Sequence, residues 1–147
     1  MIYFLDSNTC IYFLKGLYPS ILEELKQRKP EEIKIPAIVK AELLLGVEKS
    51  EHKKKNFDLY SKFLEPFEII SFDDKAAVFY AKIRASLEQK GKIIGPNDLI
   101  ISAITMANNG ILVSHNTKEF KQVSGLQLEN WVKEETNLSS LEKKTMF

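Results

Sequence analysis

The sequence has little of several features that mark whole classes of protein. Cys10 is the only cysteine among 147 residues, which excludes an internal disulfide framework and a cysteine-rich zinc site and suits a reducing compartment. No run of about 18 apolar residues occurs, and no basic segment precedes the apolar N-terminus. We therefore expect neither a membrane span nor a signal peptide, and predict a soluble, cytoplasmic protein.

An excess of charge of either sign is also missing. The chain has 21 Lys+Arg and 20 Asp+Glu, so its net charge is +1 and it has no bulk attraction to nucleic acid. Any nucleic-acid site must be a local patch. The run His52–Lys55 is one basic patch, although a solvated helix face explains it equally well. The length and a hydrophobic content of 44% are typical of a single folded domain.

Short apolar runs alternate with longer stretches of helical periodicity. The runs predict strands at Ile2–Leu5, Ile33–Ile35, Phe67–Phe72, Ile111–Ser114 and Leu126–Leu128. Helices are predicted at Thr9–Leu14, Ile21–Arg28, Ala37–Val47, Glu51–Leu64, Lys75–Gln89 and Asp98–Ala107. Strands that are separated by helices pair in parallel, so we expect an α/β fold with a mainly parallel central sheet of about 4–5 strands. The charged stretch 132–147 is predicted to be a C-terminal tail or peripheral helix outside a domain of residues 1–131.

Several acidic and amide side chains follow the predicted strands or begin a helix. Asp6 comes directly after the first strand, Asn116 and Glu119 come just after the fourth, and Asp98 begins a helix. Alternating α/β proteins bind ligands at the carboxyl ends of their parallel strands, which all meet at one edge of the sheet. Each acid also has a structural explanation, because Asp6 could cap a helix and Asp98 could be a helix-start acid.

Glu42 is a fourth candidate. On its predicted helix it shares a face with Ile38 and Leu45, so an acid falls in the row that we expect to face the core. A buried carboxylate needs a cation, hydrogen bonds or a raised pKa. Gly46 leaves open space beside it, although Glu42 could also lie at the edge of the apolar stripe.

Carboxylates that share one pocket repel each other, and a hard divalent cation relieves that repulsion. Oxygen ligands without histidine or cysteine suit Mg²⁺ or Mn²⁺ rather than zinc. Such sites activate water and stabilise a displaced phosphate oxygen. The acids therefore predict a metal-dependent site for phosphate chemistry if the fold brings them together.

Four segments, in order along the chain, resemble PIN-domain ribonucleases and in particular the VapC toxins of VapBC toxin–antitoxin modules. They are Tyr3–Asn8, Ala41–Gly46, Gly95–Ala103 and Leu112–Phe120, and the likeness extends to about Trp131. The resemblance implies a three-layer α/β/α PIN-like domain that acts as a metal-dependent endoribonuclease. It further implies a cognate VapB-type antitoxin and a homodimer or a heteromeric toxin–antitoxin assembly.

Carried over by position, the catalytic and metal-binding acids are Asp6, Glu42, Asp98 and Glu119, with Mg²⁺ as cofactor and Mn²⁺ as substitute. The last loop departs from the common pattern, because Asn116 stands where many members have Asp. Either Asn116 or Glu119 could supply the fourth ligand. Gly-Pro-x-Asp98 followed by Asn116-Thr-x-x-Phe is most similar to VapC proteins that cut initiator tRNA in its anticodon stem-loop.

Other residues have candidate roles around these acids. Ser7, Asn8 and Asn116 are expected to hold a carboxylate or orient a water, although Ser7 and Asn8 are also typical helix-cap residues. Arg84 and Lys92 flank the approach to Asp98 and are candidates for contact with an RNA phosphate.

Two other functions remain open from the residues alone. One is a non-catalytic PIN-like or receiver-like module that binds RNA or a partner. The other is a haloacid-dehalogenase-like phosphatase, which would need Asp-x-Asp after the first strand, where this chain has Asp6-Ser-Asn.

Overall fold

The computed structural model describes residues 1–133 and centres on a five-stranded sheet. The strands are β1 (Tyr3–Leu5), β2 (Ile33–Pro36), β3 (Glu68–Ile70), β4 (Ile111–Val113) and β5 (Gln127–Glu129). Their order is β3-β2-β1-β4-β5, and every neighbouring pair is parallel. The predicted parallel sheet is confirmed, and all carboxyl ends of the strands lie along one edge.

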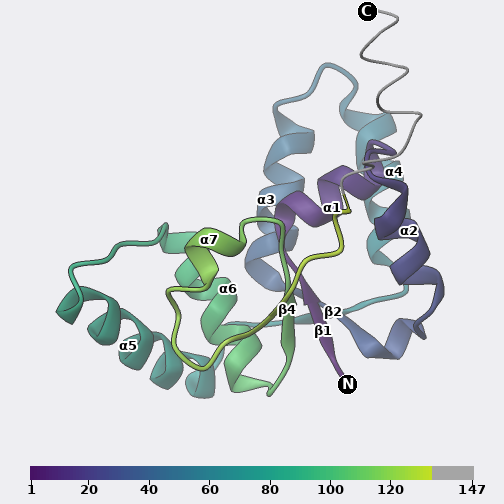
Figure 1. Cartoon of the computed structure of the whole chain (residues 1–147). Helices are drawn as coiled ribbons and strands as arrows, with labels where there is room; N and C mark the ends of the chain where they lie inside the picture. Colours follow the sequence, from purple (N-terminus) through teal and green to yellow (C-terminus); the bar gives the residue numbers. More distant parts are fainter. Residues whose placement is uncertain (134–147) are drawn as a thin grey trace, which may run out of the picture.

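Helices flank the sheet on both sides, which confirms the predicted α/β/α layering. In Figure 1, α5, α6 and α7 lie to the left of the labelled strands, α2 and α4 lie to the right, and α1 and α3 lie above. The helices are α1 (Ser7–Leu14), α2 (Pro19–Lys26), α3 (Ala37–Glu48), α4 (Lys53–Leu64), α5 (Asp74–Gln89), α6 (Pro96–Ala107) and α7 (Thr117–Phe120). The one-turn helix α7 and a 3₁₀ turn at Pro30–Glu32 were not predicted, because neither is long enough to show a period.

Helices α1 and α6 begin earlier than predicted, because the residues at their N-termini set where each helix starts. Helix α1 begins at Ser7 rather than Thr9, because Asp6 is its N-cap and accepts a hydrogen bond from the Thr9 amide at 2.9 Å. Helix α6 begins two residues early, at Pro96, since proline is preorganised for the first helical position. Strand β3 ends at Ile70, and Asp73 caps α5 by accepting a hydrogen bond from the Ala76 amide at 3.0 Å.

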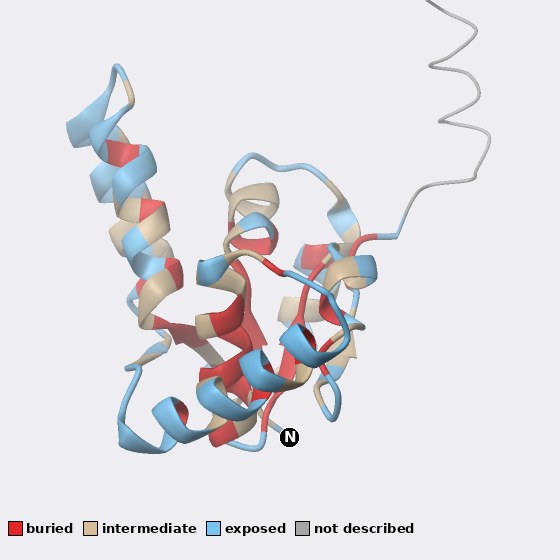
Figure 2. Ribbon diagram, turned by 90° about the vertical axis from the view of Figure 1, so that its left-hand side faces the viewer, coloured by how far each residue is buried: buried red, intermediate tan, exposed pale blue. Residues whose placement is uncertain are grey.

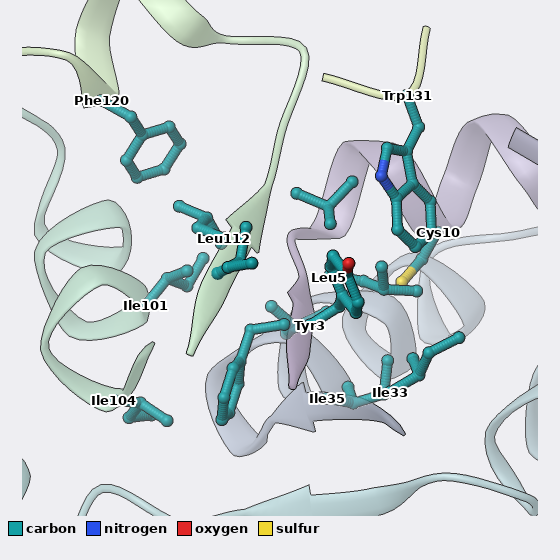
Figure 3. Close-up of a cluster of buried hydrophobic side chains, with 14 of the residues drawn as sticks. Tyr3, Leu5, Cys10, Ile33, Ile35, Ile101, Ile104, Leu112, Phe120 and Trp131 are labelled. Atoms are coloured by element: carbon teal, nitrogen blue, oxygen red, sulfur yellow. The ribbon is translucent and has the colours of Figure 1, made fainter. Parts of the chain in front are cut away.

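The core lies between the sheet and the helices. Figure 3 shows side chains of β1, β2 and β4, among them Leu5, Ile35 and Leu112, packed with Ile101 and Ile104 of α6. Figure 2 shows that the strands are largely buried, whereas the outer faces of the helices and the projecting α3–α4 hairpin are exposed. In residues 1–133 no helix is long and apolar enough to cross a membrane.

A cluster that we call the Arg28 clasp joins the end of the described chain to α2 and β1. The Arg28 guanidinium carbon lies 4.3 Å from the centre of the Tyr3 ring and 4.6 Å from that of Trp131. Its Nη1 contacts Glu24 Oε2 at 2.7 Å, and its Nη2 lies 4.0 Å from Glu129 Oε1. Trp131 and the next residue, at 132, are buried in the core, so packing continues one residue past the expected end of the domain. Residues 134–147 of the predicted tail lie outside the described part.

Candidate active site

The site lies where the strand order changes direction. From β1 the chain continues to β2 on one side, while β4 is followed by β5 on the other, so a crevice opens above the carboxyl ends of β1 and β4. Asp6 directly follows β1, and its amide donates to the carbonyl of Val113, the last residue of β4, at 3.2 Å. The two strand ends that meet in this crevice therefore hold Asp6 in place.

Asp6 is almost fully buried, with 5% of its surface exposed, and it has two roles. It caps α1 through Thr9, and Ser114 also hydrogen-bonds its side chain. Burial raises the pKa of Asp6 despite these hydrogen bonds, and the nearby charge of Glu42 raises it further. The capping interpretation is thus correct and compatible with a site role. The contribution of Ser114 was missed, although its position next to Val113 at a strand end was a usable signal.

Glu42 is half-buried at the side of α3 that faces Ser7. The Ser7 hydroxyl donates to Glu42 Oε1 at 2.7 Å, so the first turn of α1 fixes this carboxylate. The expectation that Glu42 lies in the core-facing row with Ile38 and Leu45 is wrong, because Leu45 is 53% exposed. The buried row of α3 is Val39, Leu43 and Val47, whose spacing of four residues was visible in the sequence. Glu42 lies beside this narrow row.

Asp98 and Glu119 form the other half of the site. Asp98 lies in the first turn of α6, and its pKa is raised to about 6 by partial burial, then by the charges of Glu119, Asp6 and Glu42 and by a hydrogen bond with Glu119. Glu119 Oε1 accepts from the Gly95 amide at 3.0 Å, and its Oε2 accepts from Asn116 Nδ2 at 2.6 Å. The turn before α6 and helix α7 thus bring Glu119 to Asp98.

The remaining predicted residues are distributed around this centre. Asn116 holds Glu119, and Asn8 is exposed on the first turn of α1. The Arg84 side chain bonds to Glu88 and Tyr80, and Lys92 is exposed in the loop between α5 and α6. The basic run His52–Lys55 lies at the start of α4, on the projecting hairpin (Figure 2).

The four carboxylates offer only oxygen donors to a divalent cation. Within residues 1–133, no three His, Cys, Asp or Glu side chains stand in a ready-made metal-binding arrangement. The acids are nevertheless close enough that Glu42 raises the pKa of Asp6, and Glu119, Asp6 and Glu42 raise that of Asp98. A set of oxygen donors with such mutual repulsion fits Mg²⁺ or Mn²⁺. Ser102, one turn after Asp98, is fully buried with no hydrogen-bond partner in the described part.

Comparison with known proteins identifies the family. The family model described as "PIN domain" matches residues 3–126, which include all four acids. The chain belongs to the PIN-domain family, among the VapC ribonucleases of VapBC toxin–antitoxin systems. Ribonuclease VapC2 of Rickettsia felis is 45% identical over 134 residues, which is 90% of this chain and all of that protein. The tRNA(fMet)-specific endonuclease VapC of Salmonella typhimurium is 31% identical over 88% of this chain and 97% of that protein.

A solved VapC relative has the same fold. The crystal structure of VapBC2 from Rickettsia felis bound to a promoter DNA fragment matches with a TM-score of 0.82 and 43% identity, over 89% of this chain and 99% of that one. Membership of this family confirms the resemblance drawn from the sequence. It decides against the receiver-like and phosphatase alternatives.

Proposed function

We propose that this VapC toxin hydrolyses initiator tRNA in the anticodon stem-loop, with Mg²⁺ or Mn²⁺ held by Asp6, Glu42, Asp98 and Glu119. The observation that carries the proposal is the convergence of these four acids above β1 and β4, where none of them has a basic partner among residues 1–133. A bound divalent ion there would lower the pKa of water and stabilise negative charge on phosphate oxygens.

The chain's own residues prepare this chemistry. Ser7 orients Glu42, Thr9 and Ser114 orient Asp6, and the Gly95 amide orients Glu119. With a pKa of about 6, Asp98 is mostly ionised at neutral pH, so its carboxylate can ligate a cation or accept a proton from water.

The choice of initiator tRNA is supported by the Gly95-Pro96-x-Asp98 and Asn116-Thr-x-x-Phe pattern and by the name of the Salmonella typhimurium relative. The test is incubation of the purified protein with total tRNA in Mg²⁺, followed by mapping of the new 5′ ends. We expect one cut in the initiator tRNA anticodon stem-loop. Cleavage confined to other RNAs would contradict this substrate.

Acid-to-amide variants test the assignment of the site. Asp6→Asn, Glu42→Gln and Asp98→Asn should each lower the cleavage rate about 100-fold or more, and each should abolish growth inhibition on expression. Asp73→Asn is the matched control, because Asp73 only caps α5 and asparagine caps nearly as well. Cleavage by Asp98→Asn at the wild-type rate would rule out this site.

The partner of the toxin is proposed from the relatives, whose solved structures are VapBC complexes. We propose a VapB-type antitoxin that binds this chain in the cytoplasm, in a homodimeric or heteromeric assembly. Co-expression of an adjacent antitoxin reading frame should restore growth, and the two proteins should purify together. Continued toxicity with a stably expressed antitoxin would contradict the pairing.

A further inference from the structure

A second pocket opens beside the catalytic acids. It encloses about 330 Å³ between the last turns of α5, the loop that follows and the first turn of α6. The residues that matter for its chemistry are Tyr80, Arg84, Leu87, Lys92, Ile94 and Leu99. We call it the α5–α6 pocket. Its volume is at the lower end of the range for small-molecule sites, so it suits one planar group better than a peptide helix.

The pocket adjoins the candidate active site through the first turn of α6. Pro96 and Leu99 line it, and Asp98 lies between them on the same helical turn. Gly95, just before that turn, holds Glu119 through its amide. The first turn of α6 therefore contributes residues both to the pocket and to the candidate active site.

The inside of the pocket is apolar, and its rim has two basic side chains, Arg84 and Lys92, beside one acid, Glu88. Leu87, Ile94 and Leu99 are buried at its floor, whereas Ile93 at the mouth is 89% exposed. The exposed Ile93 side chain offers apolar contact to an occupant of the pocket. Lys92, beside it, forms no ion pair among residues 1–133.

Arg84 is held in a fixed plane at the rim. Its Nε donates to Glu88 Oε1 at 3.0 Å, and its Nη1 donates to the Tyr80 hydroxyl at 3.0 Å. These bonds use edges of the guanidinium and leave the side chain exposed. A planar guanidinium is a stacking partner for an unstacked base, which is how proteins commonly recognise single-stranded RNA.

We propose that the α5–α6 pocket binds one unstacked base of the RNA next to the scissile phosphate, with Arg84 as the stacking surface and Lys92 at the adjoining phosphate. The inference rests on the proposed ribonuclease function and adds a specificity site to it. RNA is favoured over a protein occupant because the pocket is small, has the exposed Arg84 and Lys92 at its rim and shares the first turn of α6 with the candidate active site.

The test uses synthetic hairpins that span the mapped cleavage site, each with one loop nucleotide replaced by an abasic nucleotide. With the wild-type protein, one abasic position beside the cut should raise KM about tenfold and leave kcat nearly unchanged. Arg84→Lys keeps the charge but loses the plane, so it should raise KM for the intact hairpin by a similar factor. The abasic position should then cost this variant little more.

Two lysine variants test whether the effect on KM depends on where the positive charge lies. Lys92→Ala should raise KM and weaken its salt dependence, whereas Lys90→Ala, two residues earlier and outside the pocket, should do neither. The inference is wrong if Arg84→Lys and wild type respond equally to every abasic position. It is also wrong if Arg84→Lys and Ile93→Asp weaken antitoxin binding or self-association and leave KM unchanged. If the wild type cuts no RNA, the proposed function fails first, and this inference fails with it.

Discussion

Two clusters of carboxylates in this molecule are built from the same kinds of side chain and have opposite surroundings. In the Arg28 clasp, Glu24 and Glu129 share one guanidinium, which also packs against the rings of Tyr3 and Trp131. At the candidate active site, Asp6, Glu42, Asp98 and Glu119 lie close enough to influence one another's charge, and no lysine or arginine of residues 1–133 pairs with them.

The comparison distinguishes carboxylates that have a basic partner within the fold from carboxylates that have none among residues 1–133. In the clasp the chain supplies its own cation, so the interaction is complete in the folded protein. At the candidate active site, hydrogen bonds from Ser7, Thr9 and Gly95 position the acids without neutralising their charge. Partial burial and then the charges of the neighbouring acids raise the pKa of Asp98, and these unpaired negative charges favour the binding of a cation.

The largest expected effect concerns the cation itself. Mn²⁺ or Mg²⁺ that binds only the folded site should raise the free energy of unfolding by about 2.7 kcal/mol at 100 times its dissociation constant. Asp98→Asn should melt higher than wild type in EDTA, because a repelling charge is gone, and should lose most of the metal-dependent shift. Thermal melts of both proteins in EDTA and in millimolar Mn²⁺ measure this. A wild-type protein with no metal-dependent shift would contradict the convergent site.

The clasp should respond in the opposite way. Arg28→Met removes the cation that Glu24 and Glu129 share, and should lower the free energy of unfolding by about 2 kcal/mol without changing kcat. Arg84→Met is the matched control for stability, because it removes an exposed guanidinium and should cost about 0.5 kcal/mol or less. Urea denaturation measures both. Equal losses in the two variants would show that the clasp is an ordinary surface contact.

Removing a group that orients an acid should have a smaller effect than removing the acid. Asn116→Ala frees one oxygen of Glu119 and should lower activity about tenfold, whereas Glu119→Gln should lower it more, and most steeply at low Mn²⁺. Titration of activity with Mn²⁺ in both variants decides whether Glu119 or Asn116 acts at the metal. A larger loss in Asn116→Ala would assign the role to Asn116.

A further expected effect is a pH dependence of stability. Folding raises the pKa of Asp98 from 3.8 to about 6. The stability that protonated Asp98 contributes is therefore fully present below pH 3.8 and is lost as pH rises through about 6. In EDTA, wild type should therefore lose melting temperature relative to Asp98→Asn between about pH 4 and pH 7. Melts of the two proteins across this range provide the measurement. A constant difference would mean that the pKa of Asp98 is ordinary.

Part of the site could be predicted because it depends on local patterns. Asp6 after an apolar run and Asp98 beside Pro96 are strand-end and helix-start positions that sequence spacing shows. Glu42 was selected by an argument about the core face of α3 that the burial of Val39 and Leu43 corrects. Glu42 lies beside the buried row of α3 and is held by the Ser7 hydroxyl, whereas the sequence had suggested that it lies within the core-facing row.

Other features could not be predicted because they join segments that are distant in sequence. The contact of Glu119 with the Gly95 amide depends on how α7, only one turn long, packs against the start of α6. The clasp brings the rings of Tyr3 and Trp131, whose centres are 5.6 Å apart, against the Arg28 guanidinium, and no periodicity connects these three positions.

The sequence by itself determined the alternation of strands and helices, the capping role of Asp6 at α1, and the parallel pairing that follows from long crossovers. Those are local or topological consequences of apolar spacing and backbone hydrogen bonding. Only the tertiary structure decided which carboxylates meet a guanidinium and which meet one another. Charge pairing depends on distances across the fold, and those distances are set by packing rather than by position along the chain.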